Sequence, residues 1–359
     1  MRGLRPQEDQ MTVIDADAHV IETDLTWAYL SEEDRKYAPL ILEQTGGQFG
    51  QTNRGAVSTQ WWMFETNVQP ADRNINVDDL PAESRELSDV KRRLDHMDQL
   101  GIDIQVLYTT IFLSPCATDA AAEFALYHSY NQWLAEIWQK AAGRLYWAAM
   151  VPLGSMHRIR EELEFCKENG AVSVFLRPYE CDRMAFESFF FPLYELAQEL
   201  DLAITFHAGN GSVVNNKFLE PHNFARFKLA MVASFHGLLD HEVPKRFPEL
   251  RWGFIEACAS WIPHALIDAE KRLKRRGRRL DADPLGANNI YVTVEVTDDI
   301  PYIINRVGDD NLVVGTDYGH TDTSAEIEAL RIVRESGAVD GASIDKILGP
   351  NSRRLYGLN

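Results

Sequence analysis

Eight short runs of β-branched and aromatic residues alternate with longer segments whose apolar residues recur at helical spacing. The predicted strands are Thr12–His19, Asp103–Thr109, Leu145–Val151, Ala171–Leu176, Leu202–His207, Leu250–Glu256, Asn289–Val296 and Asn311–Asp317. The predicted helices are Leu87–Leu100, Ala120–Ala141, Arg158–Glu168, Phe186–Leu200, Pro263–Arg275 and Ser324–Glu335. Strands that alternate with helices form a parallel sheet buried on both faces. Eight such units favour an α/β protein with a closed (β/α)8 barrel, the TIM barrel, over an open doubly wound sheet.

Three stretches interrupt this alternation, namely residues 24–85, 208–225 and 276–288, and the last two are expected to be irregular. The first is a long insertion after the first strand and contains Trp27, Trp61 and Trp62. Long excursions from a compact domain are usually lids, pocket walls or interfaces. We expect one domain, residues 1–359, with the insertion as a lid, a pocket wall or a subunit contact. Simple packing on the outside of the barrel is the alternative.

The charge balance excludes one large class of partners. The chain has 36 basic and 54 acidic residues, a formal net charge of −18. Such a surface repels phosphate backbones, so nucleic acid is not an expected partner. We expect a small-molecule substrate and a homo-oligomer instead.

Cysteine spacing and hydropathy indicate the compartment. Cys116, Cys166, Cys181 and Cys258 are far apart and form no CxxC pair, which argues against a zinc ribbon and a disulfide framework. No apolar run reaches the ~18 residues of a membrane span. The first ten residues, MRGLRPQEDQ, lack the apolar stretch of a signal peptide. We therefore expect a cytoplasmic protein with no membrane contact.

Polar residues stand at the ends of several predicted strands, where a barrel carries its catalytic groups. Asp17 and His19 end the first strand, and His207 ends the fifth. Glu256 ends the sixth, Glu295 lies in the seventh, and Asp317 ends the eighth. The two-residue period of a strand places Asp17 and His19 on one face. His207 reaches the same point from across the barrel, and Asp317 from the strand that closes beside the first.

Two imidazoles and two carboxylates form a donor set suited to Zn²⁺, Mn²⁺ or Fe²⁺. Taken singly, each residue has a plainer interpretation, because an aspartate can cap a helix and a histidine can be a satisfied core group. Their coincidence at corresponding strand ends favours a metal, since buried charges need a partner. We predict one divalent metal per chain, zinc first, held by Asp17, His19, His207 and Asp317.

Several segments resemble the amidohydrolase superfamily: DADAHV at the start, ITFHAG in the middle, GTDYGHTD late and ILGPNSRRLYGL at the end. The segments MDQLGIDIQVLY, AAMVPLG and RFPELRWGFIEACASWIP resemble one branch of it, which contains aminocarboxymuconate-semialdehyde decarboxylase and the resorcylate-type decarboxylases. The resemblance covers nearly the whole chain. It implies a distorted barrel that binds one catalytic metal.

The resemblance also maps residue by residue. The first-strand pair of the family, His-x-His or Glu-x-His, falls on Asp17 and His19, and its strand-5 histidine and strand-8 aspartate fall on His207 and Asp317. Where binuclear relatives carry a bridging lysine this chain has Arg177, which implies no second metal. Many decarboxylases of the branch end strand 6 with a histidine, where this chain has Glu256. The proline expected after the strand-8 Asp-Tyr is Gly319, followed by His320.

These positions give a hypothesis for the chemistry. A metal with an open position lowers the pKa of its water to about 7, and Asp317 takes the proton as general base. Glu256 is either a second acid/base or an outer orienting group. His236 is assigned to the catalytic groups as a proton donor; His222 and His320 are assigned to substrate contacts. Surface or core positions are the alternative for His236 and His222. Arg177 either binds a substrate carboxylate or forms an ion pair.

The leading hypothesis is a metal-dependent hydrolase that attacks a C–N, C–O or C–C bond of a small cyclic or carboxylated substrate through a metal-activated water. The alternative is a metal-dependent non-oxidative decarboxylase, a carbon–carbon lyase, of an aromatic or enoic acid. The third hypothesis is a non-catalytic barrel that binds a small ligand. The sequence does not choose the substrate, because specificity in this fold lies in loops.

Overall fold

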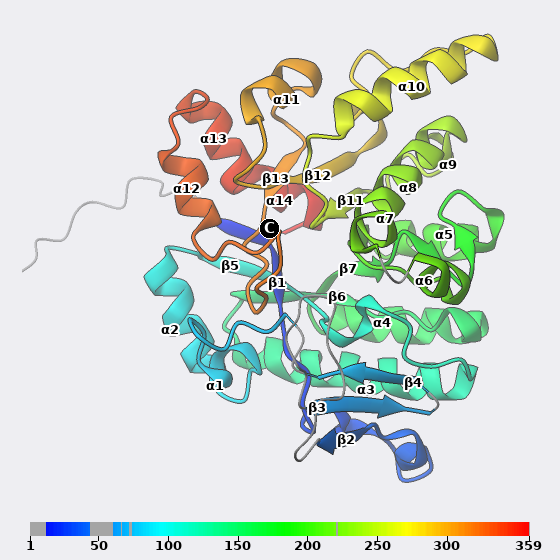
Figure 1. The fold of residues 1–359 in the computed structure, drawn as a ribbon, viewed down its shortest axis with the longest axis vertical. Coiled ribbons are helices and arrows are strands. Elements are labelled where there is room, and N and C mark those ends of the chain that lie inside the picture. Colours follow the sequence, from blue (N-terminus) through cyan, green and yellow to red (C-terminus); the bar gives the residue numbers. More distant parts are fainter. Residues whose placement is uncertain (1–11, 44–59, 66, 72–73, 220–221, 359) are drawn as a thin grey trace, which may run out of the picture.

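Eight parallel strands form one sheet that is nearly closed into a barrel, with helices around it (Figure 1). The computed structural model describes residues 12–43, 60–65, 67–71, 74–219 and 222–358. In sheet order the strands are β1 (Ile14–His19), β5 (Ile104–Tyr108), β6 (Leu145–Ala149), β7 (Ala171–Leu176), β10 (Ala203–His207), β11 (Trp252–Ile255), β12 (Ile290–Val294) and β13 (Leu312–Val314). Every predicted strand is present, seven of them with shifted ends, and the predicted TIM barrel is confirmed.

The strand residues are almost all buried because both faces are covered, by side chains inside the barrel and by helices outside. The longer helices are α2 (Val90–Leu100), α3 (Ala120–Lys140), α4 (Ile159–Glu168), α5 (Phe191–Glu199), α8 (Lys228–Asp240), α10 (Ile262–Arg275), α11 (Ile300–Val307) and α13 (Gly341–Leu348). The shorter ones are α1 (Ala82–Arg85), α6 (Val213–Leu219), α7 (Asn223–Arg226), α9 (Val243–Arg246), α12 (Ala329–Glu335) and α14 (Pro350–Tyr356). Among the described residues, no helix has an apolar run long enough to cross a bilayer.

Local sequence explains where individual helices begin and end. The Asp89 side chain accepts a hydrogen bond from Arg92 N and caps α2, which ends at Gly101 in a left-handed conformation with φ 70°. Two expectations were wrong. The helix expected from Ser324 begins only at Ala329, and the stretch 208–225, expected to be irregular, contains α6 and α7.

The insertion after β1 forms a second, antiparallel sheet of β2 (Leu40–Glu43), β3 (Gln60–Phe64) and β4 (Asn67–Pro70). Residues 44–59, 66 and 72–73 of the insertion lie outside the described residues. Trp27 and Trp62 are buried, with ring centroids 6.1 Å apart in an edge-to-face arrangement, and Trp27 also packs against Phe112. This aromatic contact fixes the small sheet to the barrel near α3 (Figure 1).

The barrel closes between β1 and the residues that follow β13. The backbone N–H of Asp317 donates to Asp17 O at 2.9 Å, and that of His19 donates to Tyr318 O at 2.7 Å. Gly315 makes this approach possible, because a Cβ on Gly315 would lie 2.3 Å from the Cβ of Asp17. The end of the last strand is therefore held directly against the first strand.

Gly315→Ala tests this contact. The added methyl group must displace the backbone of β1 or of the segment after β13, because the three atoms it meets, Cβ, Cα and N of Asp17, include no flexible side-chain end. We expect a loss of roughly 1–3 kcal/mol in the free energy of unfolding, together with weaker binding of divalent metal. Chemical denaturation and metal titration measure both. An unchanged stability and metal affinity would contradict the close approach.

Candidate metal centre

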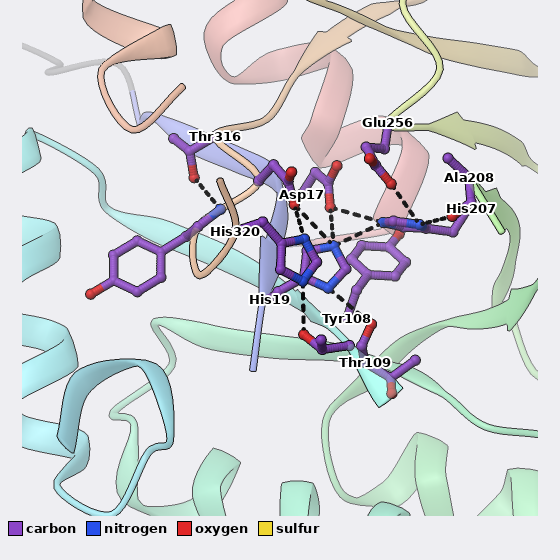
Figure 2. Close-up of polar contacts among 12 residues, drawn as sticks. Asp17, His19, Tyr108, Thr109, His207, Ala208, Glu256, Thr316 and His320 are labelled. Carbon is purple, nitrogen blue, oxygen red and sulfur yellow. Dashed lines mark hydrogen bonds and ion pairs between the residues drawn. The ribbon is translucent and has the colours of Figure 1, made fainter. Parts of the chain in front are cut away.

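Four side chains from three strand ends gather around His19 in the buried mouth of the barrel. Asp17, His19 and His207 offer ligand atoms that lie within 4.8 Å of one another (Figure 2), and Asp317 joins His19 and His320 in a second such group. The Nε2 atoms of His19 and His207 are 3.1 Å apart. Asp17 Oδ1 lies 3.2 Å from His207 Nε2, and Asp317 Oδ1 lies 3.3 Å from His19 Nε2. All four residues are buried. The structure thus brings together the four predicted metal ligands.

The hydrogen bonds of Nδ1 in His19 and His207 determine whether Nε2 of each ring carries a proton. His19 Nδ1 faces the carbonyl oxygen of Thr109 at 2.9 Å, and His207 Nδ1 faces Ala208 O and Glu256 Oε2, each at 3.3 Å. Carbonyl and carboxylate oxygens only accept hydrogen bonds here, so both Nδ1 atoms carry the proton. Both Nε2 atoms therefore present electron pairs to each other and to the carboxylates.

The two Nε2 electron pairs and the two carboxylates repel one another unless a cation lies among them. Asp317 Oδ2 is also buried and has no hydrogen-bond partner in the described part of the chain. Burial lowers the pKa of His19 well below its usual value, with His320 and His207 contributing. Burial also raises the pKa of Asp317 well above its usual value, as do the nearby Asp322 and Asp17. The donor set fits a divalent metal, whose charge reverses these effects.

The backbone at two of the strand ends is strained. Glu256, directly after β11, has φ 58°, and Asp317, three residues after β13, has φ 52°. Residues other than glycine rarely adopt this left-handed backbone conformation. When they do, they are often at functional sites. The strain is the local cost of turning both carboxylates toward the same point.

A buried arginine holds the two sides of the site together. The guanidinium of Arg93 on α2 donates from Nη1 and Nη2 to His19 O, both at 3.2 Å, and lies 3.5 Å from the ring centroid of Tyr318. Its Nε donates to Gln105 Oε1, and Gln105 in turn donates to Asp15 Oδ2. Asp15 also accepts hydrogen bonds from the N–H and hydroxyl of Thr316. Burial lowers the pKa of Arg93 to about 10 and raises that of Asp15 to about 6.

His320, assigned to substrate contacts from the sequence, lies directly beside the ligands. Its ring lies beside that of His19, with centroids 4.0 Å apart and the ring planes tilted by 32°, and its Nδ1 is 2.7 Å from Asp317 Oδ1. The hydroxyl of Thr110 lies 2.7 Å from Val20 O and 2.9 Å from His320 Nε2. His320 therefore holds Oδ1 of Asp317, while Oδ2 has no hydrogen-bond partner among the described residues.

The structure places the other predicted residues differently. Glu256 lies beside His207, as described above, which fits the orienting role. Arg177 forms a bidentate ion pair with Glu180, with Nε–Oε1 and Nη2–Oε2 distances of 2.7 Å each, so it takes the ion-pair alternative.

His236 lies on α8 with its Nε2 3.0 Å from Asp268 Oδ2 on α10, away from the metal ligands. The exposed His222 caps α7 by accepting from Ala225 N. Arg177, His222 and His236 do not line the cavity described next.

A cavity of about 1020 Å³ reaches the site through Glu256 and His320, which contact the candidate ligands His207 and Asp317. Its floor includes Glu256, His320 and Asp322. One wall comes from the insertion, through residues such as Trp62 and Val68, and another from residues 213–228, including Phe224. Described residues of the insertion therefore line this cavity.

Sequence reasoning missed several groups at this site. Lys228 Nζ donates to Glu295 Oε1, Ser324 Oγ and Glu256 O, at 2.6, 2.7 and 2.9 Å. Glu22 accepts hydrogen bonds from the hydroxyl of Thr109 and from the N–H groups of Thr110 and Ile111, and burial raises its pKa to about 7. For Glu22, the available sequence signal was a charged residue only three positions beyond His19, where the first predicted strand ends.

Comparison with known proteins agrees with this geometry. The fold and the buried N/O donor set at the strand ends are those of a metal-dependent barrel enzyme. A family model described as Amidohydrolase matches residues 14–358. The chain therefore belongs to the amidohydrolase family, and it is a metal-dependent enzyme. A search of curated proteins gives no match.

Solved structures share the fold at low sequence identity. An amidohydrolase from Mycobacterium avium subsp. paratuberculosis has a TM-score of 0.77 and 19% identity, covering 97% of this chain and 100% of that one. A 5-carboxyvanillate decarboxylase from Sphingomonas paucimobilis has a TM-score of 0.68 and 16% identity, covering 98% and 100%. A dihydroxybenzoic acid decarboxylase from a Polaromonas species, with bound manganese and the inhibitor 2-nitroresorcinol, has a TM-score of 0.65 and 17% identity, covering 98% of each chain.

His207→Ala tests the ligand set, with His236→Ala as the matched control. Loss of His207 removes one of two nitrogen donors, so we expect metal content to fall well below the wild-type level of about one ion per chain. Elemental analysis after desalting measures this, and circular dichroism checks that the barrel is folded. His236→Ala should keep the wild-type metal content, because His236 pairs with Asp268 outside the site. Equal metal content in both variants would contradict the assignment.

Proposed function

We propose that this enzyme is a hydrolase that activates water at a single divalent metal held by Asp17, His19, His207 and Asp317. The observation that carries the proposal is the buried Oδ2 of Asp317, which has no hydrogen-bond partner in the described residues, while Oδ1 of the same carboxylate lies 3.3 Å from His19 Nε2. A carboxylate oxygen placed in this way beside a metal can take a proton from water.

A divalent metal in this site supplies a water of lowered pKa and polarises the bond under attack. Asp317 accepts the proton through Oδ2 and returns it to the leaving group, while His320 holds Oδ1 in place at 2.7 Å. Glu256 Oε2 orients the ring of His207 through Nδ1. The cavity above these groups provides the space in which a substrate is bound and shielded from bulk water.

We propose zinc as the metal, because two nitrogen and two oxygen donors without sulfur suit Zn²⁺. Manganese is the second choice. The bound manganese of the Polaromonas decarboxylase supports it, since that protein shares the fold.

Decarboxylation is the second candidate, and the fold shared with two solved decarboxylases favours it. Two features of this site favour hydrolysis. Glu256 stands at the strand end where many decarboxylases of the branch carry a histidine. Arg177, the candidate for a substrate carboxylate, is neutralised by Glu180.

Asp317→Asn tests the proton role. The amide keeps the size of the side chain and one oxygen for the metal, so part of the metal should be retained. The amide does not accept a proton at neutral pH, so kcat should fall roughly 10²–10⁴-fold. Steady-state kinetics and elemental analysis on the same preparation measure both quantities. A near-normal kcat would transfer the role of base to another group, with Glu256 the first to be examined.

The type of reaction is tested directly by its products. Metal-loaded enzyme is incubated in ¹⁸O-labelled water with a panel of amides, esters, lactones and aromatic acids, and products are analysed by mass spectrometry. Hydrolysis places ¹⁸O in one product and releases no CO2. Release of CO2 without incorporation of ¹⁸O into the organic product would contradict hydrolysis and favour decarboxylation.

A further inference from the structure

We propose that Glu22 is a positioning residue for the metal centre: its carboxylate fixes the turn after β5, and this turn orients the ring of His19. The inference rests on the proposed function in one respect, the metal that His19 helps to bind. It does not depend on the type of reaction that the metal supports.

Glu22 reaches this turn because β1 and β5 are neighbouring parallel strands. His19 is paired with Tyr108 in the sheet, and the N–H of Val20 donates to Tyr108 O at 3.0 Å. The two segments therefore leave the barrel side by side. Glu22 is the third residue after β1, and Thr109 directly follows β5. Glu22 is only 4% exposed, so its carboxylate depends on hydrogen bonds from the protein.

Both carboxylate oxygens of Glu22 accept hydrogen bonds from the turn. Oε1 accepts from the hydroxyl of Thr109 at 2.5 Å and from the N–H of Thr110 at 3.1 Å. Oε2 accepts from the N–H of Ile111 at 3.1 Å. The hydroxyl of Thr109 in turn accepts from the N–H of Phe112. Donors on three consecutive residues are thus bound to one buried carboxylate, which restricts the conformation of the turn.

The turn contacts the metal centre through its first two residues. The carbonyl oxygen of Thr109 lies 2.9 Å from Nδ1 of His19 and sets the orientation of that ring (Figure 2). The hydroxyl of Thr110 lies 2.9 Å from Nε2 of His320, whose Nδ1 contacts Asp317. Hydrogen bonds that orient metal ligands in this way change metal affinity roughly 10–100-fold.

A glutamine at position 22 does not replace the carboxylate. Oε1 and Oε2 of Glu22 each accept from a backbone N–H, that of Thr110 or that of Ile111. An amide has one oxygen and one NH₂ group, so in either orientation the NH₂ group faces a backbone N–H. Glu22→Gln therefore loosens the turn with almost no change in side-chain volume.

A purely structural role is the alternative, and Glu162 on α4 provides the comparison. Glu162 is also buried, at 3% exposure, and its two carboxylate oxygens contact His128 Nδ1 and Asn131 Nδ2 at 2.8 Å each. Among the described residues, it belongs neither to the cavity lining nor to the groups that could hold a metal. Glu162→Gln therefore disturbs a buried carboxylate without disturbing the metal centre.

Zinc affinity, measured on folded protein by competition with a chromophoric chelator, tests the inference. Glu22→Gln should raise the zinc dissociation constant roughly 10–100-fold, whereas Glu162→Gln should leave it at the wild-type value. Circular dichroism checks that both variants are folded. In the Co²⁺-loaded enzyme, Glu22→Gln should also change the visible absorption bands, which report the ligand geometry of the ion, and Glu162→Gln should not.

Thr109 provides a second pair of variants, which keeps the test decisive if Glu22→Gln does not fold. Thr109→Val keeps the shape of the side chain but removes the hydroxyl bonded to Glu22, so it should also weaken zinc binding. Thr109→Ser keeps the hydroxyl and should retain the wild-type affinity. The double variant of Glu22→Gln and Thr109→Val should bind zinc about as weakly as the weaker single variant, because both substitutions break the same bond.

Three results would overturn the inference: wild-type zinc affinity in Glu22→Gln, equal losses in Glu22→Gln and Glu162→Gln, or wild-type affinity in Thr109→Val. Zinc binding and ¹⁸O incorporation by the wild-type enzyme are measured separately. A zinc-dependent hydrolase whose affinity is unchanged by Glu22→Gln would leave the proposed function standing. A wild-type enzyme that binds zinc without hydrolysis, and loses affinity in Glu22→Gln, would leave the positioning role standing.

Discussion

Two imidazole nitrogens that both present electron pairs face each other across 3.1 Å in a buried site, and the carboxylates of Asp17 and Asp317 adjoin them. When both imidazoles are neutral and their Nδ1–H groups are bonded to Thr109, Ala208 and Glu256, neither Nε2 has a proton to donate. Burial lowers the pKa of His19 and so disfavours a second proton on its ring. A divalent cation among these four groups relieves the repulsion between their electron pairs.

The fold provides the rigidity that keeps these donors in place. Each ligand stands at or just after the end of a buried strand, and the strands fix their mutual positions. The closing contact between Gly315 and Asp17 brings the eighth strand against the first. Arg93 then links the carbonyl of His19 to the ring of Tyr318, so both sides of this contact share one buried cation. Truncation of such a buried charge leaves its hydrogen-bond partners uncompensated and is strongly destabilising.

The barrel, and the gathering of the four candidate metal ligands at its mouth, could be predicted from the sequence because both depend on local pattern. The periodicity of apolar residues in strands and helices, and the alternation of strands with helices, predict the barrel. Polar residues at the strand ends predict the candidate ligands. The remaining groups depend on which side chain meets which in three dimensions. Arg177 directly follows β7 as expected, but Glu180, three residues later in the short strand Tyr179–Glu180, directs its carboxylate back to the guanidinium. His236 lies on the face of α8 that meets Asp268, and no feature of the sequence distinguishes that face from the one toward the cavity. Lys228 was missed because its partners come from three separate segments.

X-ray absorption at the zinc edge of zinc-loaded enzyme tests the central claim most directly, because it reports the donor atoms themselves. The ligand set predicts a shell of nitrogen and oxygen at about 2.0–2.2 Å without sulfur, with multiple scattering from two imidazoles. His207→Ala should reduce that scattering to one imidazole. A sulfur shell, or a spectrum without imidazole scattering, would contradict the assignment of His19 and His207 and with it the account of the site.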